Sequence, residues 1–162
     1  MKRLICTLLL LALPFSLSAC AKRSYSNEAS LEDLGNAALE ALALKQDYGI
    51  ADEDYLEDFF SPPSYVLESR ILMSSNGNDL NEIGIYRVTE GNANAMKRIL
   101  NGYLVDSLRA YEDWYNSYIP KELPKLVNAE VKVFGSYVVY AILSDADRAA
   151  AFDAIENALL NK

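Results

Sequence analysis

The chain has 162 residues, 51% of them apolar, and a formal net charge of −8. This length favours a single domain, and the acidic excess argues against nucleic acid as a partner. Because histidine is absent and the only cysteines are Cys6 and Cys20, the sequence excludes Ser-His-Asp catalysis, Cys-His catalysis and histidine-based zinc sites.

The first twenty residues have the pattern of an export signal. Lys2 and Arg3 precede an apolar stretch of about fourteen residues, shorter than the roughly 20 that a bilayer-spanning helix needs. The stretch ends at Leu17-Ser18-Ala19-Cys20, which resembles the lipobox of bacterial lipoproteins. We therefore predict that residues 1–19 are removed as a signal peptide and that Cys20 is acylated, for example with palmitate. The alternative is a secreted protein with an ordinary cysteine at this position.

Lipidation of Cys20 predicts a protein anchored to the cell membrane on its extracytoplasmic face. Residues 20–29 are polar and aperiodic, which predicts a flexible lipidated tether before a single domain over residues 30–162. Lys22 and Arg23 in this tether are expected to lie near anionic headgroups. Since Cys6 leaves with the signal peptide, no disulfide is expected within the chain.

The first elements of the domain are predicted to be a helix and a β-hairpin. Ser30 is a favourable N-cap and apolar residues then recur at helical spacing, which predicts a helix over residues 31–46. An acidic turn over residues 52–60 follows, before a Pro-Pro pair. Residues 65–74 and 82–89 are rich in Val, Ile, Leu and Tyr and flank a cluster of turn formers, so they are predicted to pair.

The longest predicted element is an amphipathic helix that starts after Asn92 and ends at Ile119, before Pro120. Its length of about 27 residues corresponds to roughly 40 Å. An apolar stripe runs along one side and charged residues lie opposite. The stripe consists of Met96, Leu100, Tyr103, Ser107, Tyr111, Trp114 and Tyr118.

A loop carrying Pro124, a second hairpin and a final helix are predicted for the rest of the chain. Residues 130–134 and 137–144 flank Gly135-Ser136, which favours a tight turn between two strands. Ser144 then caps a helix with acidic residues in its first turn. We predict an α+β two-layer sandwich, a four-stranded antiparallel sheet of two hairpins with helices on one face, in the order α-β-β-α-β-β-α.

Four segments of the domain carry a resemblance to a known family. They are Asp-Leu-Asn-Glu-Ile-Gly-Ile-Tyr (79–86), Trp-Tyr-Asn-Ser-Tyr-Ile-Pro (114–120), Val-Asn-Ala-Glu-Val (127–131) and Gly-Ser-Tyr-Val (135–138). Together with the lipobox they are similar to lipoproteins of Gram-positive gut bacteria catalogued as domain of unknown function 4358. The resemblance covers most of residues 30–160 and implies an envelope location and a fold, but no activity and no catalytic residue.

The acidic residues are the candidates for metal binding and for catalysis. Asp52-Glu53-Asp54, with Glu57 and Asp58, could offer oxygen ligands to calcium. The run lacks the glycine turn and spacing of an EF-hand loop, so we interpret it as solvated and predict no metal site. Hydrolysis of a glycosidic bond needs two carboxyl groups about 5 to 10 Å apart in a cleft. The sequence does not identify such a pair.

The aromatic end of the long helix is the candidate ligand-binding site, formed by Tyr111, Trp114, Tyr115 and Tyr118. Rings with polar ends are favoured at interfaces, where they stack on sugars or grip proteins. In a competing interpretation the stripe, Tyr103 included, packs on the sheet. We predict a non-enzymatic binding module of the cell envelope, without a cofactor, whose partner is an envelope protein or a cell-wall glycan. The alternative is a carboxylate-dependent hydrolase acting on cell-wall polymers.

Overall fold

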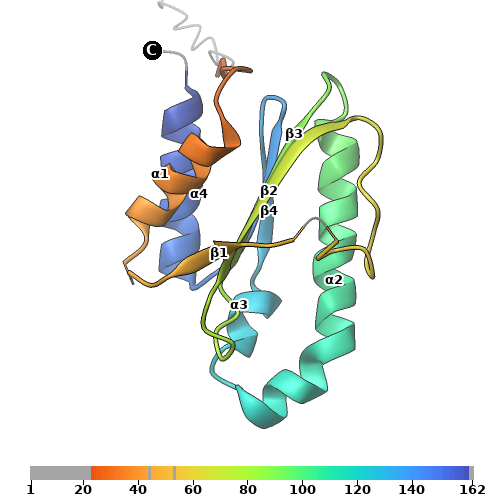
Figure 1. Ribbon diagram of the computed structural model, residues 1–162, viewed down its shortest axis with the longest axis vertical. Helices are drawn as coiled ribbons and strands as arrows, with labels where there is room; N and C mark the ends of the chain where they lie inside the picture. Colours follow the sequence, from red (N-terminus) through yellow and green to blue (C-terminus); the bar gives the residue numbers. More distant parts are fainter. Residues whose placement is uncertain (1–22, 44, 53, 161–162) are drawn as a thin grey trace, which may run out of the picture.

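The computed structural model describes residues 23–160 except positions 44 and 53 (Figure 1). The predicted signal peptide, Cys20 and Lys22 therefore lie outside the described residues. The helices are α1 (Leu31–Ala41), α2 (Ala93–Tyr118), α3 (Leu123–Val127) and α4 (Asp145–Leu159), and the strands are β1 (Tyr48–Ile50), β2 (Val66–Ser74), β3 (Glu82–Val88), β4 (Glu130–Phe134) and β5 (Tyr137–Ile142).

The general class is α+β, as predicted, but the sheet has five antiparallel strands in the order β1-β2-β3-β5-β4. The prediction of four strands is wrong because β1 pairs with the outer edge of β2. The expected helix over residues 31–46 ends at Ala41, and Leu42 already has an extended backbone. A strand of three residues is too short to produce a recognisable alternation of apolar and polar residues.

Helices cover both faces of the sheet, so the prediction of helices on one face is also wrong (Figure 1). α1 and α4 pack on one face, and α2 and α3 pack on the other. Every residue of β5 is buried: Tyr137, Val139 and Ala141 belong to the first core, and Val138, Tyr140 and Ile142 to the second. An unbroken apolar run is typical of a strand that is covered twice.

Helix α2 packs on the sheet only along its first half. Its buried residues end at Ser107, and the remaining turns extend past the ends of the strands (Figure 1). The loop expected around Pro124 is instead the short helix α3, with the proline in its first turn, where it costs no hydrogen bond. α3 packs Leu126 into the same core as α2.

The first described residues lie against the domain rather than apart from it. Tyr25 forms an isolated antiparallel bridge with Leu160, its ring contacts Phe134 edge-on with centroids 5.9 Å apart, and its hydroxyl donates to Glu156 at 2.7 Å. Arg23, which was expected to lie near headgroups, forms an ion pair with Glu156. Within the segment predicted as a tether, Arg23 and Tyr25 therefore contact the last helix. In the part of the chain that the structure describes, no helix is both long enough and apolar enough to span a bilayer.

Candidate functional site

The four predicted aromatic residues form a continuous cluster on the projecting half of α2. Tyr111, Trp114 and Tyr118 are 44%, 47% and 70% exposed, and Tyr115 is half-buried. The ring centroids are separated by 5.9 Å for Tyr111 and Tyr115, 5.3 Å for Trp114 and Tyr115, and 5.2 Å for Trp114 and Tyr118. We call these four residues the aromatic ladder. The interpretation that the whole stripe packs against the domain is correct for Tyr103 and partly correct for Tyr115, whereas Tyr111, Trp114 and Tyr118 are exposed.

The ladder leads into a cavity of about 330 Å³ between α2, the segment 55–59 and the β2–β3 hairpin. Tyr111 and Tyr115 belong to both the ladder and the cavity wall. Phe59 lies across from them, with its ring centroid 6.3 Å from that of Tyr111 and 5.1 Å from that of Tyr103. A concave site that joins apolar walls to a few polar groups is the usual form of a small-ligand site.

A buried carboxylate, Glu82, lies in the wall of this cavity. The residue is 5% exposed and begins β3. Three tyrosine hydroxyls donate to it: Tyr55 to Oε2 at 2.8 Å, Tyr103 to Oε1 at 2.8 Å, and Tyr140 to Oε1. They come from the 55–59 segment, α2 and β5, so the carboxylate joins three separate parts of the fold.

The close approach of Tyr140 to Glu82 depends on Gly84. These two residues are direct partners across β3 and β5, and a Cβ on Gly84 would lie only 1.9 Å from Cε1 of the Tyr140 ring. The ring therefore lies over the glycine, and its hydroxyl reaches the carboxylate two residues away along β3. Glycine is needed here for space, since no larger residue leaves room for the ring.

Burial sets the protonation chemistry of the cluster. It raises the pKa of Glu82, while the hydroxyl groups of Tyr140, Tyr55 and Tyr103 act in the opposite direction by donating to the charged form. Burial and the neighbouring Glu82 charge raise the pKa values of Tyr103 and Tyr140 far above their usual range. The tyrosines are therefore neutral donors at every physiological pH, and Glu82 is the titrating group.

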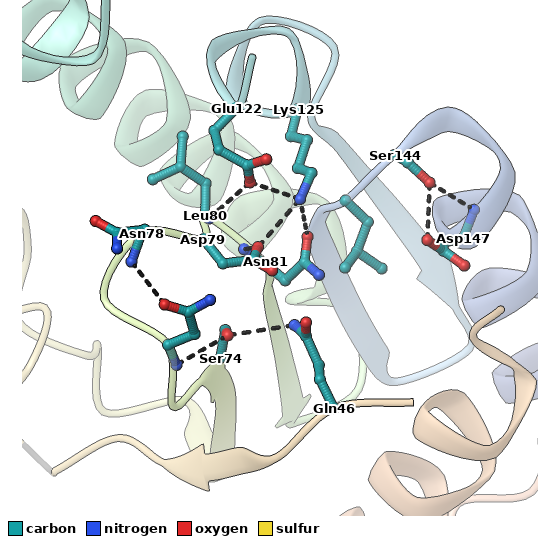
Figure 2. A network of polar contacts seen from close by, with 12 residues as sticks. Gln46, Ser74, Asn78, Asp79, Leu80, Asn81, Glu122, Lys125, Ser144 and Asp147 are labelled. Carbon is teal, nitrogen blue, oxygen red and sulfur yellow. Dashed lines mark hydrogen bonds and ion pairs between the residues drawn. The ribbon is translucent and has the colours of Figure 1, made fainter. Parts of the chain in front are cut away.

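A second polar network holds the β2–β3 hairpin against α3 beside the cavity (Figure 2). The Lys125 ammonium donates to Asp79 at 3.0 Å, Asn81 at 2.7 Å and Glu122 at 2.6 Å, and Glu122 accepts from the Leu80 backbone at 3.2 Å. Burial alone would raise the pKa of Asp79, but the backbone N–H of Asn81 and the Lys125 ammonium lower it overall. Lys125 thus compensates the acidic side chains at this end of the cavity.

Sequence reasoning identified the ladder but missed Glu82, Tyr55 and Tyr140. The available signal was a glutamate directly before four uncharged residues, Ile83 to Tyr86, within the segment 79–86. That signal becomes informative only when both faces of β3 are known to be covered, because Glu82 then has no solvent-facing side.

The acidic run around position 53 contributes only its last member to the cavity wall, Asp58. Glu53 lies outside the described residues. Within the described ranges no three acidic residues are close enough together to hold a metal ion.

Comparisons with known proteins leave the family open. No protein-family model, curated protein or solved structure matches the chain.

Proposed function

We propose that this chain is a membrane-anchored extracytoplasmic lipoprotein that acts as a non-enzymatic binding module of the cell envelope. The anchor is supported by the complete lipobox ending at Cys20 and by the resemblance to the lipoproteins of domain of unknown function 4358. Two or three acyl chains on one cysteine hold a protein at a membrane durably, since each buried methylene contributes about 0.8 kcal/mol.

One observation carries the binding function: the aromatic ladder is exposed and leads into a cavity. Tyr118 at its outer end is 70% exposed, whereas Tyr111 and Tyr115 line the cavity. Exposed rings of this size are costly to leave in water and are favoured where a protein meets a ligand or partner. A stripe whose purpose was packing alone would end where the sheet ends.

The arrangement of the two ends of the domain supports the same proposal. Tyr25 and Leu160 lie together at one end, and the projecting half of α2 lies at the opposite end (Figure 1). Because Cys20 comes shortly before Tyr25 in the sequence, a lipid on Cys20 would be attached near this end of the domain. The ladder would then face away from the membrane, where envelope ligands are accessible.

The environment of Glu82 favours binding over the alternative of carboxylate-dependent hydrolysis. A hydrolase of that kind needs one carboxyl group that delivers a proton and a second that acts as base or nucleophile. The side chains that form hydrogen bonds with Glu82 are three phenols, Tyr55, Tyr103 and Tyr140, and none of them is a second carboxyl group.

The anchor is tested by metabolic labelling with a palmitate analogue and by cell fractionation. The wild-type protein should be labelled and recovered with the membrane, and Cys20→Ala should abolish both. Ser18→Ala, which keeps the cysteine, serves as the control variant. Absence of label in the wild type, or membrane retention of the Cys20→Ala protein, would contradict the anchor.

The binding function is tested with Trp114, the only tryptophan, as a fluorescent reporter inside the ladder. Solubilised cell-wall fragments or envelope proteins should shift its emission at saturable concentrations, and Tyr118→Ala should weaken that response. Leu67→Ala removes an exposed apolar residue of β2 and is the matched control. An emission that no envelope fraction changes would contradict the proposal.

A further inference from the structure

The side chains that line the cavity include acidic groups but no basic one. Asp58, Asp79 and Glu82 line it, and no lysine or arginine does. Asp79 is paired with Lys125 at 3.0 Å, but no basic side chain of the described residues pairs with Glu82. A buried carboxylate is normally paired or hydrogen-bonded, and here the hydrogen bonds come entirely from neutral phenols. The site therefore lacks a positive partner for Glu82.

The hydrogen bonds between the tyrosines and Glu82 determine which of their atoms remain able to bind a ligand. Each tyrosine has one hydrogen to donate, and Tyr55 and Tyr103 both direct theirs to Glu82. What these two hydroxyls present to a ligand is lone pairs. Oε2 of Glu82 accepts only from Tyr55, so this oxygen keeps a further acceptor position.

Ser107 adds another polar atom to the same wall. Its Oγ is buried near the Tyr103 hydroxyl, and no hydrogen bond of acceptable geometry joins it to a described group. The residue is 5% exposed and lines the cavity. Unsatisfied buried hydroxyls cost about 1 to 3 kcal/mol unless a ligand or water pairs with them.

Aromatic rings form much of the remaining wall. Tyr55, Phe59, Tyr103, Tyr111 and Tyr115 all line the cavity. The face of such a ring attracts a cation within about 6 Å, most strongly when water is excluded. For an anion the wall is less favourable, because no lysine or arginine lines it and the phenol hydrogens of Tyr55 and Tyr103 are already directed to Glu82.

From these observations we propose that the cavity binds the primary ammonium group of an organic ligand, with Glu82 as its counter-charge and the rings as its walls. The proposal rests on the binding function above and specifies its ligand: the envelope molecule recognised by the ladder carries a free amino group. The N–H groups of that ammonium would donate to Oε2 of Glu82 and to the hydroxyl oxygens of Tyr55 and Tyr103.

The experiment uses three matched probes: n-pentylamine, n-pentanol and pentanoate. They share a five-carbon chain and differ in charge. Calorimetry on the full lipidated chain in nonionic detergent micelles at neutral pH gives the affinities, and Trp114 emission gives an independent reading. Pentylamine should bind at least about tenfold more tightly than pentanol, and pentanoate should bind most weakly. Equal affinities for the amine and the alcohol would overturn the proposal.

Substitution of the counter-charge sharpens the test. Glu82→Gln should remove the preference for pentylamine while leaving the weak binding of pentanol unchanged. Glu40→Gln, an exposed charge loss on α1 across the sheet, should leave both unchanged. Retention of the amine preference in a folded Glu82→Gln protein would overturn the role of Glu82.

A measurement on the wild-type chain covers the case in which Glu82→Gln does not fold. Ammonium binding favours ionised Glu82, so pentylamine affinity should fall as the pH is lowered and Glu82 becomes protonated, whereas pentanol affinity should stay constant. A pH-independent amine affinity would overturn the proposal. If cell-wall fragments shift Trp114 emission but pentylamine does not bind, the ligand class is wrong and the binding function stands. If neither acts, the binding function itself fails.

Discussion

The two faces of the sheet are built from the same strands but have different contents. On the α1 and α4 face the core is apolar and includes Leu34, Ile85 and Phe152, all at most 1% exposed. On the α2 face a second apolar core lies beside Glu82, its three tyrosines and a cavity. The residues of the first core make mainly apolar contacts. The α2 face combines its apolar core with a cavity and a buried carboxylate, a combination that is typical of ligand-binding sites.

The largest expected effect is a loss of stability, with unchanged ligand binding, for a substitution on the α1 and α4 face. Phe152→Ala removes a ring that is 1% exposed and contacts Phe134. The free energy of unfolding should fall by about 3 to 5 kcal/mol, measured by denaturant titration. The folded fraction should bind pentylamine as the wild type does. A changed affinity would mean that the two faces are coupled.

A smaller loss of stability, accompanied by lost binding, is expected at Gly84 on the cavity face. Gly84→Ala pushes the Tyr140 ring away and disturbs its bond to Glu82. Overpacking of this kind costs about 1 to 3 kcal/mol, and pentylamine affinity should fall as well. Gly102→Ala is the control: its added Cβ meets nothing within 4 Å, and alanine favours helix. If the two variants have the same free energy of unfolding and the same pentylamine affinity, the close approach of Gly84 and Tyr140 contributes to neither stability nor binding.

The pH dependence of stability should also distinguish the faces. Burial raises the folded-state pKa of Glu82, so the folded chain binds a proton more tightly than the unfolded chain does. The contribution of Glu82 to the free energy of unfolding is most favourable below the pKa of this residue in the unfolded chain, about 4.3. This contribution decreases as the pH rises through the pKa of Glu82 in the folded chain, and it is constant at higher pH. The difference in unfolding free energy between wild type and Glu82→Gln, followed across this range, should therefore decline with rising pH. A difference that increases with pH would contradict a raised pKa for Glu82.

The smallest stability effect is expected at the outer end of the ladder. Tyr118 is 70% exposed and contacts only Trp114 among the described rings. Tyr118→Ala should change the free energy of unfolding by no more than about 0.5 kcal/mol while weakening the Trp114 response to envelope ligands. A larger destabilisation would show that the ladder serves the fold.

Local signals predicted most of the elements. The hydroxyl groups of Ser30 and Ser144 accept from the backbone N–H groups of Asp33 and Asp147, so both predicted helix caps are confirmed. Gly135 adopts φ 63° in the tight turn between β4 and β5. These helix caps and this turn depend on residues that are close together in the chain, so they can be predicted from the sequence.

Features set by long-range contacts were not predictable in the same way. β1 forms only because β2 offers an edge at Leu72, Met73 and Ser74. The second helical layer shows in sequence only as the unbroken apolar run from Tyr137 to Leu143, which a single covered face does not require. Glu82 meets Tyr140 across 58 positions, so the polar cluster exists only once the sheet order is known.

The pairing of Tyr25 with Leu160 has a practical consequence for constructing fusions. A fluorescent protein or affinity tag appended after the last helix starts from the end of the domain opposite the projecting half of α2 (Figure 1). Such a reporter leaves the projecting half of α2 accessible. An insertion in the turn after Tyr118 would instead lie next to the aromatic ladder.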